Sequence, residues 1–213
     1  MISRILFTYV ISSNLDADCK TWRYAADIFN DIGFVIEIFI PIFVSMNPFT
    51  FGLISCAANV SKCLCGIAGV STRSVLSEHF AKSKNMADLS AKDASQETIV
   101  GLTGMLVGTV LAAHLGEEEY VKTIMIVSVL IIVHLYANYL AVSSVVLNTL
   151  NRQRFWLLVQ TYLDQGRLLT PKEISKLEDI FWKGSQPRVY CGGELSRFIK
   201  QYGCESIRSC RLI

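Results

Sequence analysis

The sequence is poor in the residues that disordered and ordinary soluble chains use most. Of its 213 residues only 18% are charged, 4 are proline and 13 are glycine, whereas 52% are hydrophobic. The mean hydropathy is +0.41. So little glycine and proline excludes a collagen-like or low-complexity chain, and the apolar content excludes disorder because such a chain has ample surface to bury. The composition therefore favours a membrane protein.

A concentrated positive charge is also missing. The net charge at pH 7 is only +2, whereas nucleic-acid binders usually carry a localised basic excess. We therefore expect no nucleic-acid partner. The seven cysteines form no CxxC pair, and several lie in apolar sequence. Their odd number and spacing predict reduced thiols that pack, not a disulfide framework.

Three stretches contain almost none of the charged residues. In residues 32–59 the single charged residue is Glu37, and residues 99–116 contain no Lys, Arg, Asp or Glu. In residues 123–151 the single titratable residue of the Lys, Arg, Asp, Glu and His types is His134. A spanning helix needs about 20 mostly apolar residues, so the third stretch is long enough and the second is marginal. Three membrane-spanning helices are therefore expected, with buried core helices of a soluble protein as the alternative.

Prolines and polar residues inside these stretches lead to three further predictions. Pro41, Asn47 and Pro48 predict a kink or break in the first stretch, because proline cannot continue a helix interior. The carboxylate of Glu37 is expected to face protein or water, not lipid. His134 is expected to make a helix-packing hydrogen bond, and a proton relay is the alternative.

Small residues recur at every fourth position in the second stretch. The third stretch has two small residues with the same spacing, which could pack against them. Such ridges let helix backbones approach closely in a membrane. The link over 116–122 is short, which predicts that the two stretches form an antiparallel helical hairpin. The predicted helix-packing residues are Gly104, Gly108, Ala112, Ala137 and Ala141.

The fold class expected is mainly α: a helical membrane bundle over residues 1–155 with a small soluble α or α+β tail over 156–213. Lysines and arginines in 60–98 and at the start of the tail place both segments on the cytoplasmic or equivalent side. In the tail, Thr170 and Glu173 predict a capping box and a helix to about residue 182. A short strand at 188–191 and a helix at 194–202 are expected to follow.

The polar connector over 60–98 is the candidate functional segment. We expect Ser71 or Thr72 to cap one helix there and Ser90 with Asp93 to cap the next. Charged groups gathered between apolar helices indicate a ligand or ion site, or alternatively a structural ion-pair network. The candidate site residues are Glu37, Asn59, Lys62, Arg73, Glu78, His79, Asn85, Lys92, Asp93, Gln96 and Glu97.

Motifs for common catalytic and cofactor chemistries are missing from the sequence. It contains no GxxxxGK[ST] phosphate loop, no GxGxxG after a strand, no GxSxG and no HExxH. Cys63, Cys65 and His79 lack the paired spacing of a zinc site. We therefore expect no bound metal, no cofactor and no enzymatic activity.

Several strings together resemble one known family. DCKTWRYAAD at 18–27, EIFIP at 37–41, ANVSK at 58–62 and GIAGVSTRSVLSEHFAKSKNMADLSAKDASQETIVGLTG at 66–104 resemble the root UVB-sensitive (RUS) family. The resemblance covers about residues 1–155. It implies a eukaryotic, membrane-associated protein of unsettled biochemical activity, linked in plants to UV-B sensing, vitamin B6 homeostasis, auxin transport and plastids. The family domain begins upstream of Met1, so an N-terminally truncated fragment is expected.

The resemblance supplies no catalytic residues, and it matches the polar motif itself from Asn59 to Glu97. We therefore expect an integral membrane protein that binds or moves a small polar metabolite at this motif, in a membrane the sequence does not identify. The bilayer is the expected partner, with a helical protein partner or a homo-oligomer left open. A membrane scaffold is the alternative function, and a soluble or peripheral enzyme is the third.

Overall fold

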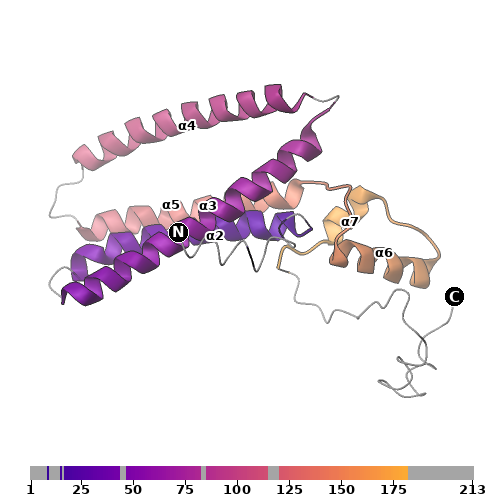
Figure 1. Ribbon diagram of the computed structural model, residues 1–213, viewed down its shortest axis with the longest axis horizontal. Coiled ribbons are helices and arrows are strands. Elements are labelled where there is room, and N and C mark those ends of the chain that lie inside the picture. Colours follow the sequence, from indigo (N-terminus) through magenta and orange to yellow (C-terminus); the bar gives the residue numbers. More distant parts are fainter. Residues whose placement is uncertain are drawn as a thin grey trace, which may run out of the picture. The chain divides into compact units, whose positions relative to one another are not determined.

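The computed structural model describes Tyr9, Leu15 and residues 17–43, 47–82, 85–114 and 120–181, with the side chains of 41–43 left out. Within these ranges the chain forms six helices and no strand, which confirms the mainly α class (Figure 1). The strand expected at 188–191 and the helix at 194–202 lie outside the described residues. The helices are α2 (Cys19–Phe43), α3 (Pro48–Phe80), α4 (Met86–His114), α5 (Tyr120–Ser144), α6 (Arg152–Gln165) and α7 (Pro171–Leu177).

The break expected near Pro48 is confirmed, and it separates α2 from α3. The side chain of Asn47 caps α3 by accepting a hydrogen bond from the amide of Phe49 at 3.1 Å, and Pro48 occupies the first turn, where an amide proton has no helical partner. The two helices then pack against each other (Figure 1). Buried Ala26 and Ala68 let their backbones approach.

The segment 60–98 is not a connector between helices, so this expectation is wrong. α3 continues without interruption to Phe80, and α4 begins at Met86. The helix starts expected at Ser71 or Thr72 and at Ser90 are therefore also wrong. Thr72 is fully buried, and its hydroxyl donates to the carbonyl of Ala68 at 2.7 Å within the helix. Packing of this face against α2 outweighs the capping tendency of a hydroxyl side chain.

Among the described helices, α3, α4 and α5 are each long and apolar enough to cross a membrane. The second and third apolar stretches thus correspond to α4 and α5, although α5 ends at Ser144. The first span is α3, which starts at Pro48, and not a helix over 32–59. No residue of α4 is buried, so its apolar side chains face outward. Faces of this kind indicate contact with lipid or with other helices.

The hairpin expected between α4 and α5 is not seen, because the structure packs α5 against α2 instead. A Cβ atom at Gly104 or Gly108 would meet no atom within 4 Å. Ala112, Ala137 and Ala141 are likewise exposed. The packing of α5 against α2 is explained by polar partners that α2 offers, since buried polar groups must be hydrogen-bonded. Whether the small residues pack against another chain stays a prediction.

The first compact unit of the chain covers residues 1–182, and the division expected at residue 155 stays a prediction. α6 is capped by Asn151 at its start and by Gly166 at its end, and the Gly166 φ of 68° lies in the left-handed region that glycine tolerates best. α7 begins with the predicted capping box of Thr170 and Glu173 but ends at Leu177, before residue 182. Contacts of α7 with α5 tie this segment to the helices before it.

The capping box predicts a pH dependence for α7. The backbone amide of Thr170 donates to the Glu173 carboxylate, and the side chains of Arg167 and Thr170 add two further hydrogen bonds, so the pKa of Glu173 falls from 4.5 to about 2. A lowered pKa contributes stability above the ordinary value and loses it as the pH falls toward the folded value. We expect the thermal stability of wild type, relative to Glu173→Gln, to decline between about pH 4.5 and pH 2. A constant difference across this range would contradict the prediction.

Candidate functional site

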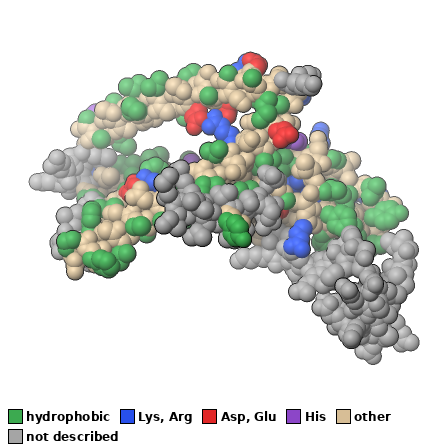
Figure 2. Space-filling view, in the orientation of Figure 1, with side chains coloured by type: hydrophobic (Ala, Val, Ile, Leu, Met, Phe, Trp, Pro, Cys, Tyr) green, Lys and Arg blue, Asp and Glu red, His purple; other side chains and the backbone are tan. Residues whose placement is uncertain are grey.

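A groove of about 830 Å³ lies between α3 and α4. Figure 2 shows acidic and basic side chains gathered between these helices. Five of the predicted site residues line the groove: Arg73, Lys92, Asp93, Gln96 and Glu97. Arg23 of α2 and the apolar side chains of Val70, Leu76, Phe80, Leu89 and Val100 complete the wall. The groove therefore combines a charged edge with an apolar lining.

Arg73 is the centre of the charged edge. Its Nε lies 2.7 Å from the Asp93 carboxylate, and its Nη1 lies 2.6 Å from that of Glu97. The two acids are four residues apart, so α4 presents both on one face to a single guanidinium. The side chains remain 40% to 67% exposed. Such exposed pairs add little stability, and solvent or a competing anion can replace one of them.

The other two cations of the groove have weaker or local partners. Arg23 donates to the carbonyl of Gly69 at 3.5 Å. Lys92 pairs with Asp88, one turn earlier on α4, at 2.8 Å. Three cations and two carboxylates thus line the groove, which gives it a formal excess of one positive charge.

Glu37 and Lys62 form a second polar site between α2 and α3. The Lys62 ammonium lies 2.6 Å from both carboxylate oxygens and 4.6 Å from the centre of the Phe34 ring. Gly33 makes room for the lysine stem, because a Cβ there would lie 2.8 Å from Lys62 Cγ. The structure thus gives Glu37 a protein partner in this otherwise apolar part of the helix pair.

The remaining predicted site residues do not line the groove. Asn59 donates to the carbonyl of Ser55 at 2.9 Å within its own helix. The ring of His79 contacts that of its neighbour Phe80 at a centroid distance of 5.1 Å. Glu78 and Asn85 are exposed. The eleven candidates therefore divide into a groove, a separate ion pair and four residues that join neither.

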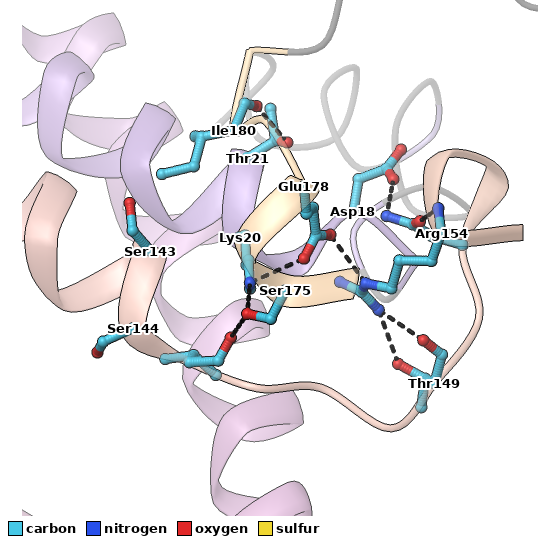
Figure 3. Close-up of polar contacts among 12 residues, drawn as sticks. Asp18, Lys20, Thr21, Ser143, Ser144, Thr149, Arg154, Ser175, Glu178 and Ile180 are labelled. Atoms are coloured by element: carbon cyan, nitrogen blue, oxygen red, sulfur yellow. Dashed lines mark hydrogen bonds and ion pairs between the residues drawn. The ribbon is translucent and has the colours of Figure 1, made fainter. Parts of the chain in front are cut away.

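A buried ion network at the start of α2 was not predicted. Figure 3 shows Glu178 between two cations: Lys20 lies 2.7 Å away and Arg154 lies 2.8 Å away. All three side chains are at most 5% exposed. Lys20 also donates to Ser175 at 3.1 Å, and Arg154 donates to the carbonyl of Thr149 at 2.7 Å. The network ties α2 to α6 and to the residues that follow α7.

No pattern in the sequence connects Lys20 with Arg154. Their shared partner Glu178 is more than 150 positions from Lys20, so no local spacing reveals the contact. The only sequence signal is weak: Asn151 and Arg154 open a helix directly after an apolar span. Long-range packing, and not a motif, creates this network.

His134 of α5 makes the predicted helix-packing hydrogen bond. Its Nδ1 lies 2.9 Å from the Asp31 carboxylate of α2, and its Nε2 lies 2.8 Å from Asn138. In the part of the chain that the structure describes, no group of three or more His, Cys, Asp or Glu side chains could hold a metal. The cysteines described there, Cys19, Cys56, Cys63 and Cys65, form no disulfide bond.

Comparison with known proteins places the chain in a family. Residues 1–166 match the family model described as a vitamin B6 photo-protection and homoeostasis domain. "RUS family member 1" of Dictyostelium discoideum is 39% identical over 94% of this chain and 38% of its own length. "Protein root UVB sensitive 3" of Arabidopsis thaliana is 38% identical over 84% of this chain and 40% of its own.

A more distant Arabidopsis thaliana relative, "Protein root UVB sensitive 2, chloroplastic", is 28% identical over 81% of this chain and 39% of its own length. The chain thus spans about two fifths of the length of these curated relatives. No solved structure matches significantly. The collinear strings from 18–27 to 66–104 and the match over residues 1–166 agree, and the chain belongs to the root UVB-sensitive family.

Proposed function

We propose that this chain is an integral membrane segment that binds a small polar metabolite in the groove between α3 and α4. The observation that supports this proposal most is the position of the Arg73 guanidinium. It lines the groove and is paired with two exposed carboxylates that a ligand could replace. A ligand anion can replace Glu97, the more exposed of the two acids, and take two parallel hydrogen bonds from the guanidinium. No step of covalent chemistry is required.

The apolar wall of the groove supports a ligand with a ring or short hydrocarbon part beside its anionic group. Ligand pockets are commonly apolar with a few polar groups that fix orientation. The description of the family model names vitamin B6 homoeostasis. Vitamin B6 compounds are therefore the first ligands to test. Pyridoxal phosphate has a ring and an anion, whereas pyridoxine has the ring alone.

The test is equilibrium binding of pyridoxal phosphate to the protein in lipid nanodiscs. We expect Arg73→Ala to weaken binding at least about tenfold, which corresponds to about 1.4 kcal/mol. Arg167→Ala is the matched control, because Arg167 pairs with an exposed acid, Glu173, outside the groove. Pyridoxine should bind more weakly than the phosphate. Equal binding to wild type and Arg73→Ala, or none to either, would refute the proposed site for this ligand class.

Membrane insertion is supported by the outward apolar faces of α4 and α5. Val100, Leu106 and Val129 are each at least 60% exposed, and they lie in helices long and apolar enough to cross a membrane. Alkaline carbonate extraction of membranes should leave the protein in the pellet. Release into the soluble fraction would show that these helices are covered by protein, and would favour the peripheral alternative.

A scaffold is the second candidate function, and the exposure of α4 favours it. This helix has no buried residue, and its small residues Gly104 and Gly108 are open to a partner helix. Gly104→Leu combined with Gly108→Leu should abolish partner binding in a protein that still inserts, if the scaffold function holds. Retained assembly would leave these glycines without that role.

A further inference from the structure

The histidine in the middle of α5 stands in the most hydrophobic span of the chain. Of the three described helices that could cross a membrane, α5 is the most hydrophobic. Opposite it, the carboxylate side chain of Asp31 on α2 is only 8% exposed, whereas that of His134 is 41% exposed. An ionisable pair at such a position is costly unless it is paired, and it is a candidate functional site in membrane proteins.

Both ring nitrogens of His134 have partners. Nδ1 lies 2.9 Å from Asp31 Oδ2, and Nε2 lies 2.8 Å from Asn138 Nδ2. An ionised Asp31 can only accept a hydrogen bond, so Nδ1 carries a proton and donates it. The amide nitrogen of Asn138 donates to Nε2, which is then unprotonated. This arrangement describes a neutral imidazole with a hydrogen bond at each ring nitrogen.

The same three side chains also satisfy an imidazolium. When Nε2 takes up a proton it becomes a donor and needs an acceptor. A rotation of the Asn138 amide by half a turn replaces the NH₂ group with the carbonyl oxygen at nearly the same position, because the two ends of an amide are close in size. Nδ1 still donates to Asp31, so no hydrogen bond is lost.

We propose that Asp31, His134 and Asn138 form a binding site for one proton between α2 and α5. The proton comes from water and is held on Nε2, with no other bond formed or broken. Its arrival changes the contact between the two helices from a neutral hydrogen bond into an ion pair between imidazolium and carboxylate. The Asn138 amide can donate to the unprotonated Nε2 and can accept from the protonated one, so it fits both protonation states of the ring.

Several titratable and charged groups face the pair. Asp27 lies one turn before Asp31 on α2 and is close enough to interact electrostatically with it and with His134. Arg23, two turns before Asp31, also interacts with Asp27, and its charge is opposite to that of the carboxylates. The other titratable groups facing the site are Tyr24 on α2, Cys65 on α3 and Tyr139 on α5. The neighbouring charged groups are thus the carboxyls of Asp27 and Asp31 and the guanidinium of Arg23.

The direct test is nitrogen NMR of the protein labelled with ¹⁵N-histidine in lipid nanodiscs. The chain has three histidines, and His134→Gln assigns the signals of His134 by their loss. Between about pH 8 and pH 5, the range in which imidazoles commonly titrate, we expect Nε2 of wild type to change from unprotonated to protonated while Nδ1 remains protonated. A ring that keeps one protonation state throughout this range would overturn the proposal.

Two variants test the roles of the partners. Asn138→Leu removes the acceptor for a protonated Nε2, and Asp31→Asn removes the counter-charge, so both should lose the doubly protonated signal at pH 5. Asn59→Leu is the matched control, because Asn59 is bonded only to Ser55 of its own helix, and its spectra should equal those of wild type. A doubly protonated ring in both Asp31→Asn and Asn138→Leu would show that these two side chains do not form the site.

Discussion

Glu178→Gln is expected to destabilise the folded chain by about 3–5 kcal/mol, the usual cost of breaking a buried ion pair by removing one partner. The carboxylate lies 2.7 Å from Lys20 and 2.8 Å from Arg154, and none of the three side chains is more than 5% exposed. The amide keeps the shape of the side chain but removes its charge. Two buried cations would then face each other without a counter-charge.

Reversible unfolding in mixed micelles, followed by circular dichroism, measures this effect. Asp164→Asn is the matched control, because Asp164 is an exposed acid on α6, and its change should stay within about 0.5 kcal/mol. The combined replacement Lys20→Met, Arg154→Met and Glu178→Leu should cost less than Glu178→Gln alone, since it leaves no buried charge. A loss below about 1 kcal/mol for Glu178→Gln would show that water reaches this network in solution.

The spans could be predicted from the sequence because hydropathy is a local property. Residues 99–114 and 123–144 of the predicted stretches lie on helices that can cross a membrane. The role of α2 could not be predicted in this way, since Asp27, Asp31 and Glu37 dilute its apolar character. Pro48 marked a break, but it did not reveal that the helices on either side of the break pack together.

The groove was predictable in part, for a related reason. Arg73, Asp93 and Glu97 lie within 25 positions of one another in one polar segment, so a short junction between α3 and α4 is enough to bring them together. Lys20 and Glu178 are far apart in the sequence, and their contact depends on the packing of four helices. His134 was recognised as a polar group in a span, but only the structure identifies Asp31 as its partner.

Three polar residues of α2 have the same role in the fold. Each matches a polar group that another helix or segment carries: Lys20 matches Glu178, Asp31 matches His134, and Glu37 matches Lys62. Polar groups buried among apolar helices must find such partners. This requirement explains why α5 packs against α2 and not against α4, although α4 is its neighbour in the sequence.

Neutralising either member of the pair between Glu37 and Lys62 is expected to cost about 2 kcal/mol, because the remaining charge would lie between apolar helices without a partner. The pair is 2.6 Å apart, and about a third of each side chain is exposed, so the effect should be smaller than that of Glu178→Gln. Glu37→Gln and Lys62→Met are the single variants. The same unfolding measurement in mixed micelles determines both.

The double variant separates the ion pair from the packing of the lysine stem over Gly33 and Phe34. If the pair itself stabilises the contact, the double variant should lose less than the sum of the single losses, with an interaction free energy of about 1–2 kcal/mol. Glu78→Gln is the control, because this exposed acid lies on α3 with no role in the pair. Strictly additive losses would mean that each charge is solvated separately, and that α2 and α3 are held together by their apolar and small residues alone.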